Sequence, residues 1–385
     1  MWLNMSKIRL LRVVTSDNAL DWHMKNTLTR LNHDSDFEVC VVGDFVSQFS
    51  NDYENIKFVD IPIKRKICLA NDIKSLVKLI SIIFEFKPNI LHSIMPKASL
   101  LSALAGFICR TKVRMHTFTG QYWVLNRLPF LKLMYWVDRL VCSLNTHPLT
   151  DGMSQAFFLR ENGINIFKSD EKPWLGEGSL SGVNLIKRTT LDVPNIISNN
   201  AESFLFCFLA RKVEEKGAFD VLHAFNNVKS KMPNSKLLYI GPIVDNVQYN
   251  YLKENKPHLF DKVIEIDQIK NPMSYLCNVD VICLPSYIEG FSSVVIEAGV
   301  FGKPTVGYNI IGIRDSIAHL STGLLSEVGS VVGFSYNMLY LYENKFEYSR
   351  ISSNVKKDFR EKYNADFLYN ELKNVYFKYL LGNRK

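Results

Sequence analysis

Residues 279–305, VDVICLPSYIEGFSSVVIEAGVFGKPT, form the stretch that says most about the fold. Its first part, 279–286, is an almost continuous apolar run, which is typical of a strand buried on both faces of a parallel sheet. A helix is expected after Gly290, where Ser292 and Ser293 can cap the first turn. A buried strand followed directly by a helix is the repeating unit of α/β folds.

The same alternation of short β-branched runs with amphipathic stretches extends over most of the 385 residues. Predicted strands lie at 7–15, 37–44, 89–94, 113–119, 139–144, 205–210, 236–241, 262–267, 279–286 and 304–309. Predicted helices include 19–34, 71–86, 99–110 and 218–231. Strands that alternate with helices predict an α/β protein with two doubly wound, Rossmann-like parallel sheets, whose carboxyl ends share a ligand-binding cleft.

A change of composition divides the chain. Periodicity is lost at 188–203, RTTLDVPNIISNNAES, which gathers Thr, Asn, Ser and Pro and is therefore the predicted hinge. We expect an N-terminal domain over residues 1–190 and a C-terminal domain over 191–363. Residues 364–385 should form a last amphipathic helix, whose apolar face needs a surface to cover, and the N-terminal domain is the candidate surface.

Composition and charge restrict the class of protein. Hydrophobic residues make up 47% of the chain and charged residues 22%, as in ordinary globular proteins. The seven cysteines are odd in number and never spaced as CxxC, which favours reduced thiols in the cytoplasm. Residues 1–190 hold 24 Lys and Arg against 17 Asp and Glu. This basic half should meet an anionic partner, either a phosphate-bearing ligand or a membrane surface.

Two glutamates stand out in the opening stretch. Glu289 follows the predicted strand, so it should lie at the carboxyl end of the sheet, where α/β folds bind ligands. The helix amides near Phe291, Ser292 and Ser293 should form an anion site at the same place. Glu297 lies among apolar neighbours, where an ionised carboxylate needs donors such as the two hydroxyls of a ribose. Alternatively, Glu297 forms a structural ion pair and Glu289 is a turn residue.

Two cations follow the first predicted strand of the second half. In LARKVEEKGAFD, residues 209–220, Arg211 and Lys216 flank an acidic turn before a helix that starts near Gly217. Both should face the same cleft as Glu289, and solvated surface charges are the ordinary alternative. Together with the helix amides, these cations favour a phosphate-bearing ligand.

These motifs resemble those of a known family. LARKVEEKG, YIGP, LPSYIEGFSSVVIEA, GKPTVGYNIIGIRD and TGLL occur in this order and resemble the nucleotide-sugar-binding domain of family 4 retaining glycosyltransferases, which have the GT-B fold. The resemblance implies that Glu297 holds the nucleotide ribose and that Glu289 contacts the donor sugar. It also implies that Arg211 and Lys216 bind the diphosphate of a donor that is expected to be UDP-linked, and that the sugar is transferred with retention.

The first half resembles a part of the same family. LHSIMPKASLLSALAGF and VRMHTFTGQYW are similar to enzymes that add an N-acetylhexosamine to a polyprenyl-diphosphate-linked sugar, and GSLSGVN resembles their loop before the hinge. The resemblance implies a lipid-linked acceptor, as in bacterial surface polysaccharide, O-antigen or lipopolysaccharide assembly. His116 is the candidate polar group beside the reacting sugar, with a satisfied core histidine as the alternative. Thr119 stands where many relatives have His, and Asn184 where Asp is common.

The candidate site residues fall into three groups. The catalytic candidates are His116, Arg211, Lys216 and Glu289. The donor-binding candidates are Arg211, Lys216, Glu289, Gly290, Phe291, Ser292, Ser293 and Glu297, and the acceptor-binding candidates are Lys97 and Thr119.

Neither a metal site nor a cofactor is expected. Arg211, Lys216 and the helix amides can stabilise a leaving diphosphate without a metal, and the only D-x-D, residues 34–36, has the setting of a polar turn. A sugar-nucleotide epimerase of the same fold, and a non-enzymatic basic protein that binds phosphate or nucleic acid, are the alternatives. A dehydrogenase is disfavoured because no GxGxxG follows a predicted strand, and no nucleic-acid-binding motif is present.

The basic excess of the first half suggests how the acceptor is reached. Residues 126–140, NRLPFLKLMYWVDRL, interleave Arg127, Lys132 and Arg139 with Leu, Phe, Tyr and Trp, as in segments that rest on an anionic bilayer. We therefore expect a cytoplasmic enzyme, peripheral at the inner face of the cytoplasmic membrane. A core helix with snorkelling cations is the alternative.

Overall fold

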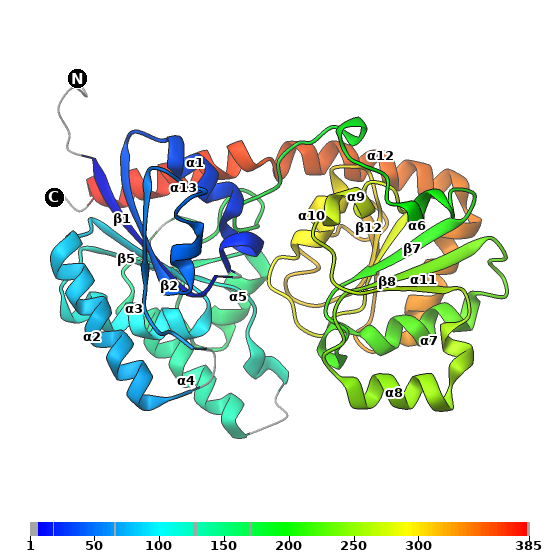
Figure 1. Ribbon diagram of the computed structural model, residues 1–385, viewed down its shortest axis with the longest axis horizontal. Helices are drawn as coiled ribbons and strands as arrows, with labels where there is room; N and C mark the ends of the chain where they lie inside the picture. The colour runs from blue at the N-terminus through cyan, green and yellow to red at the C-terminus, as the bar shows by residue number, and fades with distance from the viewer. Residues whose placement is uncertain (1–6, 18, 65–66, 126–128, 170, 383–385) are drawn as a thin grey trace. The chain divides into compact units, whose positions relative to one another are not determined.

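The computed structural model describes residues 7–17, 19–64, 67–125, 129–169 and 171–382. The chain forms two compact units, residues 1–182 with 365–385, and residues 183–364. The chain therefore passes between the units twice, before Val183 and after Asn364. These two residues pair in a parallel bridge. Within the described residues, each unit contains one parallel six-stranded sheet (Figure 1).

The sheet of the first unit has the strand order β3-β2-β1-β4-β5-β6. Its strands are β1 (Ile8–Ser16), β2 (Phe37–Asp44), β3 (Ile56–Asp60), β4 (Ile90–Ile94), β5 (Val113–Phe118) and β6 (Leu149–Thr150). The helices described in this unit are α1 (Lys25–His33), α2 (Leu69–Phe86), α3 (Pro96–Ile108), α4 (Pro129–Leu144), α5 (Met153–Glu161) and α13 (Ala365–Gly382), with short turns η1 (Leu20–Met24), η2 (Val46–Phe49) and η3 (Tyr122–Leu125).

Both faces of the first sheet are covered by helices. Along β1, Leu10 and Val14 point to one face and join the core formed with α1 and α13, whereas Leu11 and Val13 point to the other and join α2 and α3. This follows from the two-residue period of a strand. It explains why the first strand carries apolar side chains on both of its faces.

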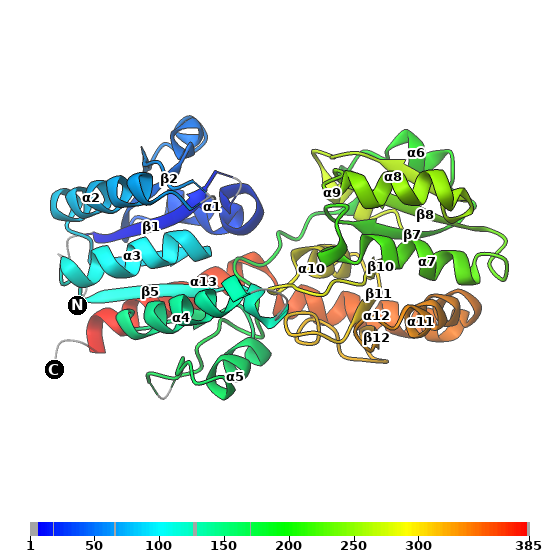
Figure 2. The same ribbon diagram turned by 90° about the horizontal axis from the view of Figure 1, so that it is seen from below.

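The last helix, α13, belongs to the first unit although it comes from the opposite end of the chain (Figures 1 and 2). Leu368, Leu372 and Tyr376 recur every four residues and therefore lie on one side of the helix. All three are buried in the same core as Leu10 and Val14 of β1. The apolar stripe of α13 thus covers the face of the first sheet.

The second unit repeats this architecture, with the strand order β12-β11-β10-β7-β8-β9. Its strands are β7 (Phe204–Leu209), β8 (Ser235–Ile240), β9 (Val263–Ile266), β10 (Val281–Leu284), β11 (Thr305–Tyr308) and β12 (Gly323–Ser326). The helices described here are α6 (Asn195–Ser198), α7 (Ala218–Val228), α8 (Asn246–Asn255), α9 (Pro272–Leu276), α10 (Ser293–Gly299), α11 (Val331–Glu343) and α12 (Lys345–Lys362), with turns η4 (Arg188–Thr190), η5 (Glu214–Lys216) and η6 (Pro257–Phe260).

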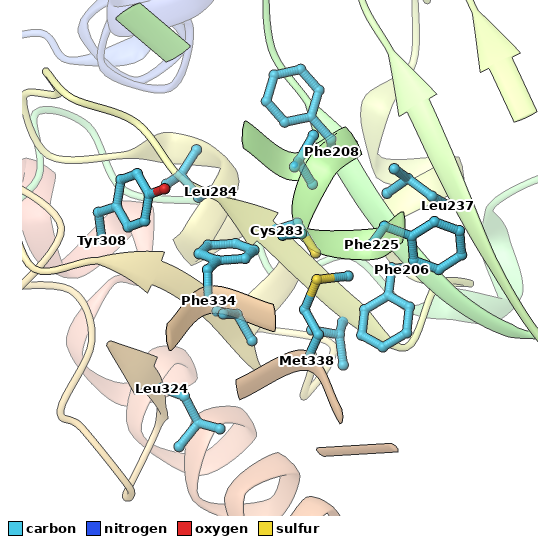
Figure 3. Packing of buried hydrophobic residues seen from close by; sticks show 14 of the residues in the cluster. Phe206, Phe208, Phe225, Leu237, Cys283, Leu284, Tyr308, Leu324, Phe334 and Met338 are labelled. Carbon is cyan, nitrogen blue, oxygen red and sulfur yellow. The ribbon is translucent and has the colours of Figure 1, made fainter. Parts of the chain in front are cut away.

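The core of the second unit is rich in aromatic side chains. Phe206 and Phe208 of β7 pack with Phe225 of α7, and Phe334 and Met338 of α11 lie in the same cluster (Figure 3). All five side chains are completely buried. Large apolar side chains contribute most per residue to such a core, about 2–3 kcal/mol each on full burial.

The structure differs from the sequence-based expectations at several places. Residues 139–144, predicted as a strand, form the end of α4, where Val141 and Cys142 are buried. A short apolar run cannot by its periodicity alone be distinguished from the buried side of a helix. The strands β3, β6 and β12 were not predicted, and all three are short strands at sheet edges.

The predicted hinge is also placed differently. Residues 188–203 lie inside the second unit, where Ile197 is buried under the sheet. The first crossing between units comes earlier, after Gly182, and not at the predicted boundary of residue 190. Polar composition marks an exposed connection, but it does not distinguish a hinge from a surface loop of one unit.

Candidate active site

The two central strands of the second sheet, β7 and β10, mark the point where the strand order reverses. From β7 the chain continues to β8 on one side, and from β10 it continues to β11 on the other. In open α/β sheets, ligands bind beyond the carboxyl ends of the strands at this point. A ligand site is therefore expected at the loops that follow these strands, residues 210–217 and 285–292.

A lysine and a glutamate from these two loops meet there. Lys216 Nζ lies 2.8 Å from Glu289 Oε1 and 3.2 Å from the carbonyl oxygen of Ile288. The same carboxylate oxygen accepts a hydrogen bond of 2.9 Å from the hydroxyl of Ser286, which is fully buried. The ion pair is therefore held at a defined position while both side chains keep part of their surface exposed.

Backbone contacts hold the two loops against each other. Gly217 has a φ of +65°, and a Cβ at this position would lie 1.8 Å from the carbonyl oxygen of Pro285, so no other residue fits. The amide of Tyr287 donates a hydrogen bond of 2.9 Å to the carbonyl oxygen of Glu215. This close approach brings Lys216 within reach of Glu289.

A third loop, between β11 and β12, closes on the same place. Gly312 has a φ of +90°, and a Cβ there would lie 2.0 Å from the carbonyl oxygen of Gly290. Only a glycine allows the backbones of these two loops to touch. The position of Gly290, directly after Glu289, is thus determined by the loop from the next strand.

Glu297 lies one turn into α10 and is mostly surrounded by protein. None of the residues that the structure describes makes a hydrogen bond or an ion pair with its carboxylate. Loss of hydration on burial raises the pKa of this carboxyl to about 7. The structural ion pair, which was the alternative interpretation of Glu297, is not observed in the described part of the chain.

The start of α10 has further unused hydrogen-bonding capacity. Ser292 is the N-cap residue, as the sequence indicates, but its side chain makes no capping hydrogen bond. The N–H groups of the first helical turn have no partner within the helix. Because helical side chains tilt toward the N-terminus, Glu297 is directed back toward Ser293, four residues earlier on the same side.

Arg211 follows β7 but does not join the pair of Lys216 and Glu289. Its guanidinium lies 2.6 Å from Glu215 Oε1, and its side chain is more than a third exposed. A surface ion pair of this kind contributes little to stability, so Arg211 can leave it at low cost.

A partly buried carboxylate near the site was not predicted. Asp220, in the first turn of α7, accepts hydrogen bonds from the hydroxyls of Tyr287 at 2.7 Å and Tyr308 at 2.8 Å. It thereby links α7 to the loop of Glu289 and to β11. An aspartate in a first helical turn has an ordinary role near the helix dipole, so the sequence carried no signal for this link.

Comparison with known proteins identifies the family. Residues 192–358 match the family described as glycosyl transferases group 1. Residues 192–358, which make up most of the second unit, therefore belong to the glycosyl transferases group 1 family.

Relatives of this glycosyltransferase match it over most of its length. It is 28% identical over 352 residues to the capsular polysaccharide biosynthesis glycosyltransferase CapM of Staphylococcus aureus, with 88% of each chain covered. It is 22% identical over 301 residues to the UDP-Gal:alpha-D-GlcNAc-diphosphoundecaprenol alpha-1,3-galactosyltransferase of Escherichia coli, with 73% of each chain covered. The structure of Anabaena Alr3699/HepE in complex with UDP-glucose matches with a TM-score of 0.74 at 14% identity, over 96% of this chain and 99% of that one. The fold is GT-B, with two Rossmann-like domains.

In the first unit of the glycosyltransferase, His116 lies in the core. It is 3% exposed, within β5 and not at its end, and its Nδ1 lies 3.1 Å from both the hydroxyl and the carbonyl oxygen of Ser93. Burial lowers the pKa of His116 to about 3, so the ring is neutral. This is the satisfied core histidine, and we assign His116 to the core and not to the reacting centre.

The two acceptor-binding candidates have different surroundings. Lys97, at the start of α3, forms an ion pair of 2.8 Å with Asp72 of α2, and both side chains are mostly buried. This contact gives Lys97 a structural role in joining two helices. Thr119 is partly exposed just after β5, and its contact with an acceptor stays a prediction.

The residues of the D-x-D motif lie before β2 and contact side chains of α13. Asp34 accepts a hydrogen bond from the hydroxyl of Tyr369 at 2.7 Å, and Lys373 of α13 lies within 2.7 Å of both Asp34 and Asp36. These contacts attach α13 to the first unit. Among the described residues, no three His, Cys, Asp or Glu side chains gather as a set of metal ligands.

Proposed function

We propose that this glycosyltransferase moves a sugar from a UDP-sugar to a lipid-linked sugar in bacterial surface polysaccharide assembly, with retention. The observation that carries the proposal is the carboxylate of Glu297, which has no partner among the described residues and lies in the helix that follows the loop of Glu289. The names of the relatives support it, because one concerns capsular polysaccharide and another a UDP-sugar and a diphosphoundecaprenol-linked acceptor. An N-acetylhexosamine is a candidate for the transferred sugar.

Glu297 is the group that holds the ribose in this proposal. A ribose offers two hydroxyl donors, and a carboxylate can accept both. Hydrogen bonds from a ligand to the ionised form favour that form, so donor binding should lower the raised pKa of Glu297. The carboxylate is costly to bury without a partner, and the ribose hydroxyls would remove this cost.

Lys216 and Arg211 stabilise the leaving diphosphate in this proposal. Both are held by carboxylates, Lys216 by Glu289 and Arg211 by Glu215, and both can turn to a diphosphate. The amides at the start of α10 would add neutral donors for the same charge. Glu289 would then be free to accept a hydrogen bond from a hydroxyl of the donor sugar.

This arrangement provides positive charge where a metal-dependent enzyme would provide carboxylates, so we expect transfer that persists in excess EDTA.

The donor proposal is tested by measuring UDP-sugar affinity by calorimetry at pH 6 and pH 8. In the unmodified protein, binding should tighten with pH, because Glu297 must ionise to accept the ribose hydroxyls. Glu297→Gln should bind about tenfold more weakly at pH 8 and lose the pH dependence. Glu343→Gln, an exposed glutamate of α11, is the control and should behave as the unmodified protein. Equal affinities for all three proteins would contradict the role of Glu297.

The surface of the first unit supports the membrane part of the proposal. On α2 the side chains of Leu69, Ile73 and Val77 are at least 60% exposed, and on α4 Trp136 is 59% exposed. Arg139 lies over the ring of Trp136 at 5.4 Å. Both helices pack against α3.

Exposed cations accompany these apolar side chains. Lys74 and Lys78 lie on α2, and Lys132 and Arg139 on α4. Exposed apolar side chains with interspersed cations suit the interface of an anionic bilayer. Arg127, the third cation of the predicted stretch, lies outside the described residues. Within those residues, no helix has the length and apolarity needed to cross a bilayer.

Co-sedimentation with vesicles tests this contact. A variant with Lys74, Lys78, Lys132 and Arg139 changed to Gln should lose binding to anionic vesicles at low salt, because each cation contributes about 1 kcal/mol near such a surface. The control removes four exposed lysines of the second unit, Lys231, Lys270, Lys345 and Lys357, and should bind as before. Equal loss in both variants would indicate a general charge effect and contradict a specific surface.

A further inference from the structure

A buried arginine lies in the middle of the first sheet. Arg12 of β1 and His92 of β4 are direct partners in the parallel ladder, and both point to the face that α13 covers. Arg12 Nη1 lies 2.7 Å from His92 Nδ1 and 2.7 Å from the hydroxyl of Tyr376, which comes from α13. Arg12 is only 5% exposed. A charged side chain in such a position needs compensation.

The hydrogen bonds determine where the protons are. A guanidinium can only donate, so His92 Nδ1 must be the acceptor and the ring proton is on Nε2. Nε2 then donates to the hydroxyl of Thr117 at 2.8 Å. Burial, together with the charge of Arg12, holds the pKa of His92 well below its ordinary value, which agrees with a neutral ring. The whole positive charge therefore stays on Arg12.

No carboxylate in the described residues pairs with this charge. The Nε atom of Arg12 is buried without a hydrogen-bond partner, and no ion pair of Arg12 is found within the described ranges. The contacts of Nη1, an imidazole nitrogen and a phenol oxygen, are neutral. An uncompensated buried charge costs several kcal/mol. The network as it stands is therefore incomplete.

A small pocket lies against the same arginine. Its walls include Arg12, His92, Thr117 and Ser179, and all of its lining residues belong to the first unit. None of the described lining residues is acidic. The hydroxyl of Thr117 accepts the proton of His92 and so keeps its own hydrogen to donate. The lining thus suits an anion and disfavours a cation.

The pocket is small, with about 10 Å³ of space for the centre of a water-sized particle. This space suits a monatomic anion better than a phosphate or a sulfate. A water molecule in it would leave the charge of Arg12 uncompensated. We propose that this pocket binds a single halide ion, chloride in the cell, as the counter-ion of Arg12.

The ion would join distant parts of the first unit. Arg12 and Tyr376 are 364 residues apart, and the pocket also contains Leu372 of α13. By compensating Arg12, a bound chloride stabilises the packing of α13 on the sheet. This site lies in the first unit and uses none of the residues of the proposed donor site, so it does not depend on the proposed function.

Thermal unfolding tests the site. The melting temperature should rise by about 2–4 °C when gluconate is replaced by chloride at constant ionic strength, and the rise should saturate. Bromide should have the same effect as chloride. Arg12→Met should lose the response to chloride, whereas Arg9→Gln, which removes a partly exposed arginine of the same strand, should keep it. A rise with phosphate and none with either halide would contradict the proposal.

Crystals of the unmodified protein soaked in bromide give a test that needs no variant. An anomalous peak in this pocket, beside the guanidinium of Arg12, is the expected result. A water molecule at this place, with no anomalous peak at a bromide concentration that saturates the thermal effect, would overturn the proposal. The same would follow if the melting temperature were equal in chloride and gluconate.

Discussion

In the first sheet β1 and β4 lie side by side at the centre, and in the second sheet β7 and β10 occupy the same place. The first pair carries Arg12 opposite His92, buried inside the strands. The second pair carries Phe206 opposite Val281, and its charged residues come only in the loops beyond the strands. One topology therefore accommodates a buried polar network in one unit and an accessible charged site in the other.

The difference teaches how burial separates structure from function in this protein. The charges of the second unit stay at the exposed carboxyl ends of strands, where a ligand can reach them and where desolvation is limited. The polar groups of the first unit lie under α13 and are mostly satisfied by each other. Substitutions of the exposed cations at these strand ends should therefore affect activity, and substitutions in the buried network of the first unit should affect stability.

The largest effect should come from Lys216→Ala. Loss of this cation removes stabilisation of the leaving diphosphate, and we expect turnover of the UDP-sugar to fall by about 10²–10³-fold. The measurement is the steady-state rate of sugar transfer. Lys231→Ala removes an exposed lysine from the same unit and should leave the rate unchanged. A folded Lys216→Ala protein with the original rate would contradict a catalytic role for the charged loops of the second unit.

Glu297→Gln should stabilise the second unit in a pH-dependent way. The pKa of Glu297 is about 7 in the folded protein against an ordinary value of 4.5, so the folded state binds its proton more tightly. Stability therefore falls as pH rises from about 4.5 to 7 in the unmodified protein, and Gln avoids this loss. The advantage of the variant should grow from nothing near pH 4 to at most about 3 kcal/mol at pH 8.

Urea unfolding at several pH values measures this advantage. A difference in the free energy of unfolding that is the same at all pH values would show that burial does not raise the pKa of Glu297.

Asp220→Ala should destabilise the loop that carries Glu289. It removes the carboxylate that accepts hydrogen bonds from the hydroxyls of Tyr287 and Tyr308, at a cost of about 2 kcal/mol. Asp220→Asn keeps an acceptor oxygen and should cost less. The free energy of unfolding of the two variants gives the comparison. Equal losses would show that the hydroxyls do not depend on the oxygen of residue 220.

The smallest effect should come from Lys97→Met in the first unit. Its ion pair with Asp72 is partly buried, so we expect a loss of about 1 kcal/mol in the free energy of unfolding and no change in UDP-sugar affinity. Lys57→Met, from an exposed pair with Glu85, is the control and should cost less. A large loss of the transfer rate with an unchanged free energy of unfolding would instead support a role for Lys97 in acceptor binding.

Much of the fold could be predicted from the sequence because central strands are apolar on both faces. The predicted strands at 37–44 and 205–210 match β2 and β7 to within one residue. The edge strands β3, β6 and β12 could not be predicted in this way, since they are short and less regular in pattern. The strand predicted at 139–144 is wrong because a short apolar run also suits one side of a helix.

For the candidate site, the spacing of residues after strands was informative. Lys216 and Glu289 were both placed at carboxyl ends of strands, and the structure brings them to 2.8 Å. Their roles in catalysis stay predictions. For His116 the pattern left a reacting group and a core histidine open, and the structure places the histidine inside β5 against Ser93. A histidine in a strand looks the same in sequence whether it faces a ligand or a core.

By itself, the sequence determined the alternation of strands and helices and the ends of strands at which charged residues gather. These features depend on local periodicity and on a few neighbouring residues. Only the tertiary structure decided which groups have partners. Lys97 forms an ion pair with Asp72, and Arg12 donates a hydrogen bond to Tyr376 from the other end of the chain. The carboxylate of Glu297 has no partner among the described residues. Such contacts depend on how distant segments pack, and burial then makes each missing partner costly.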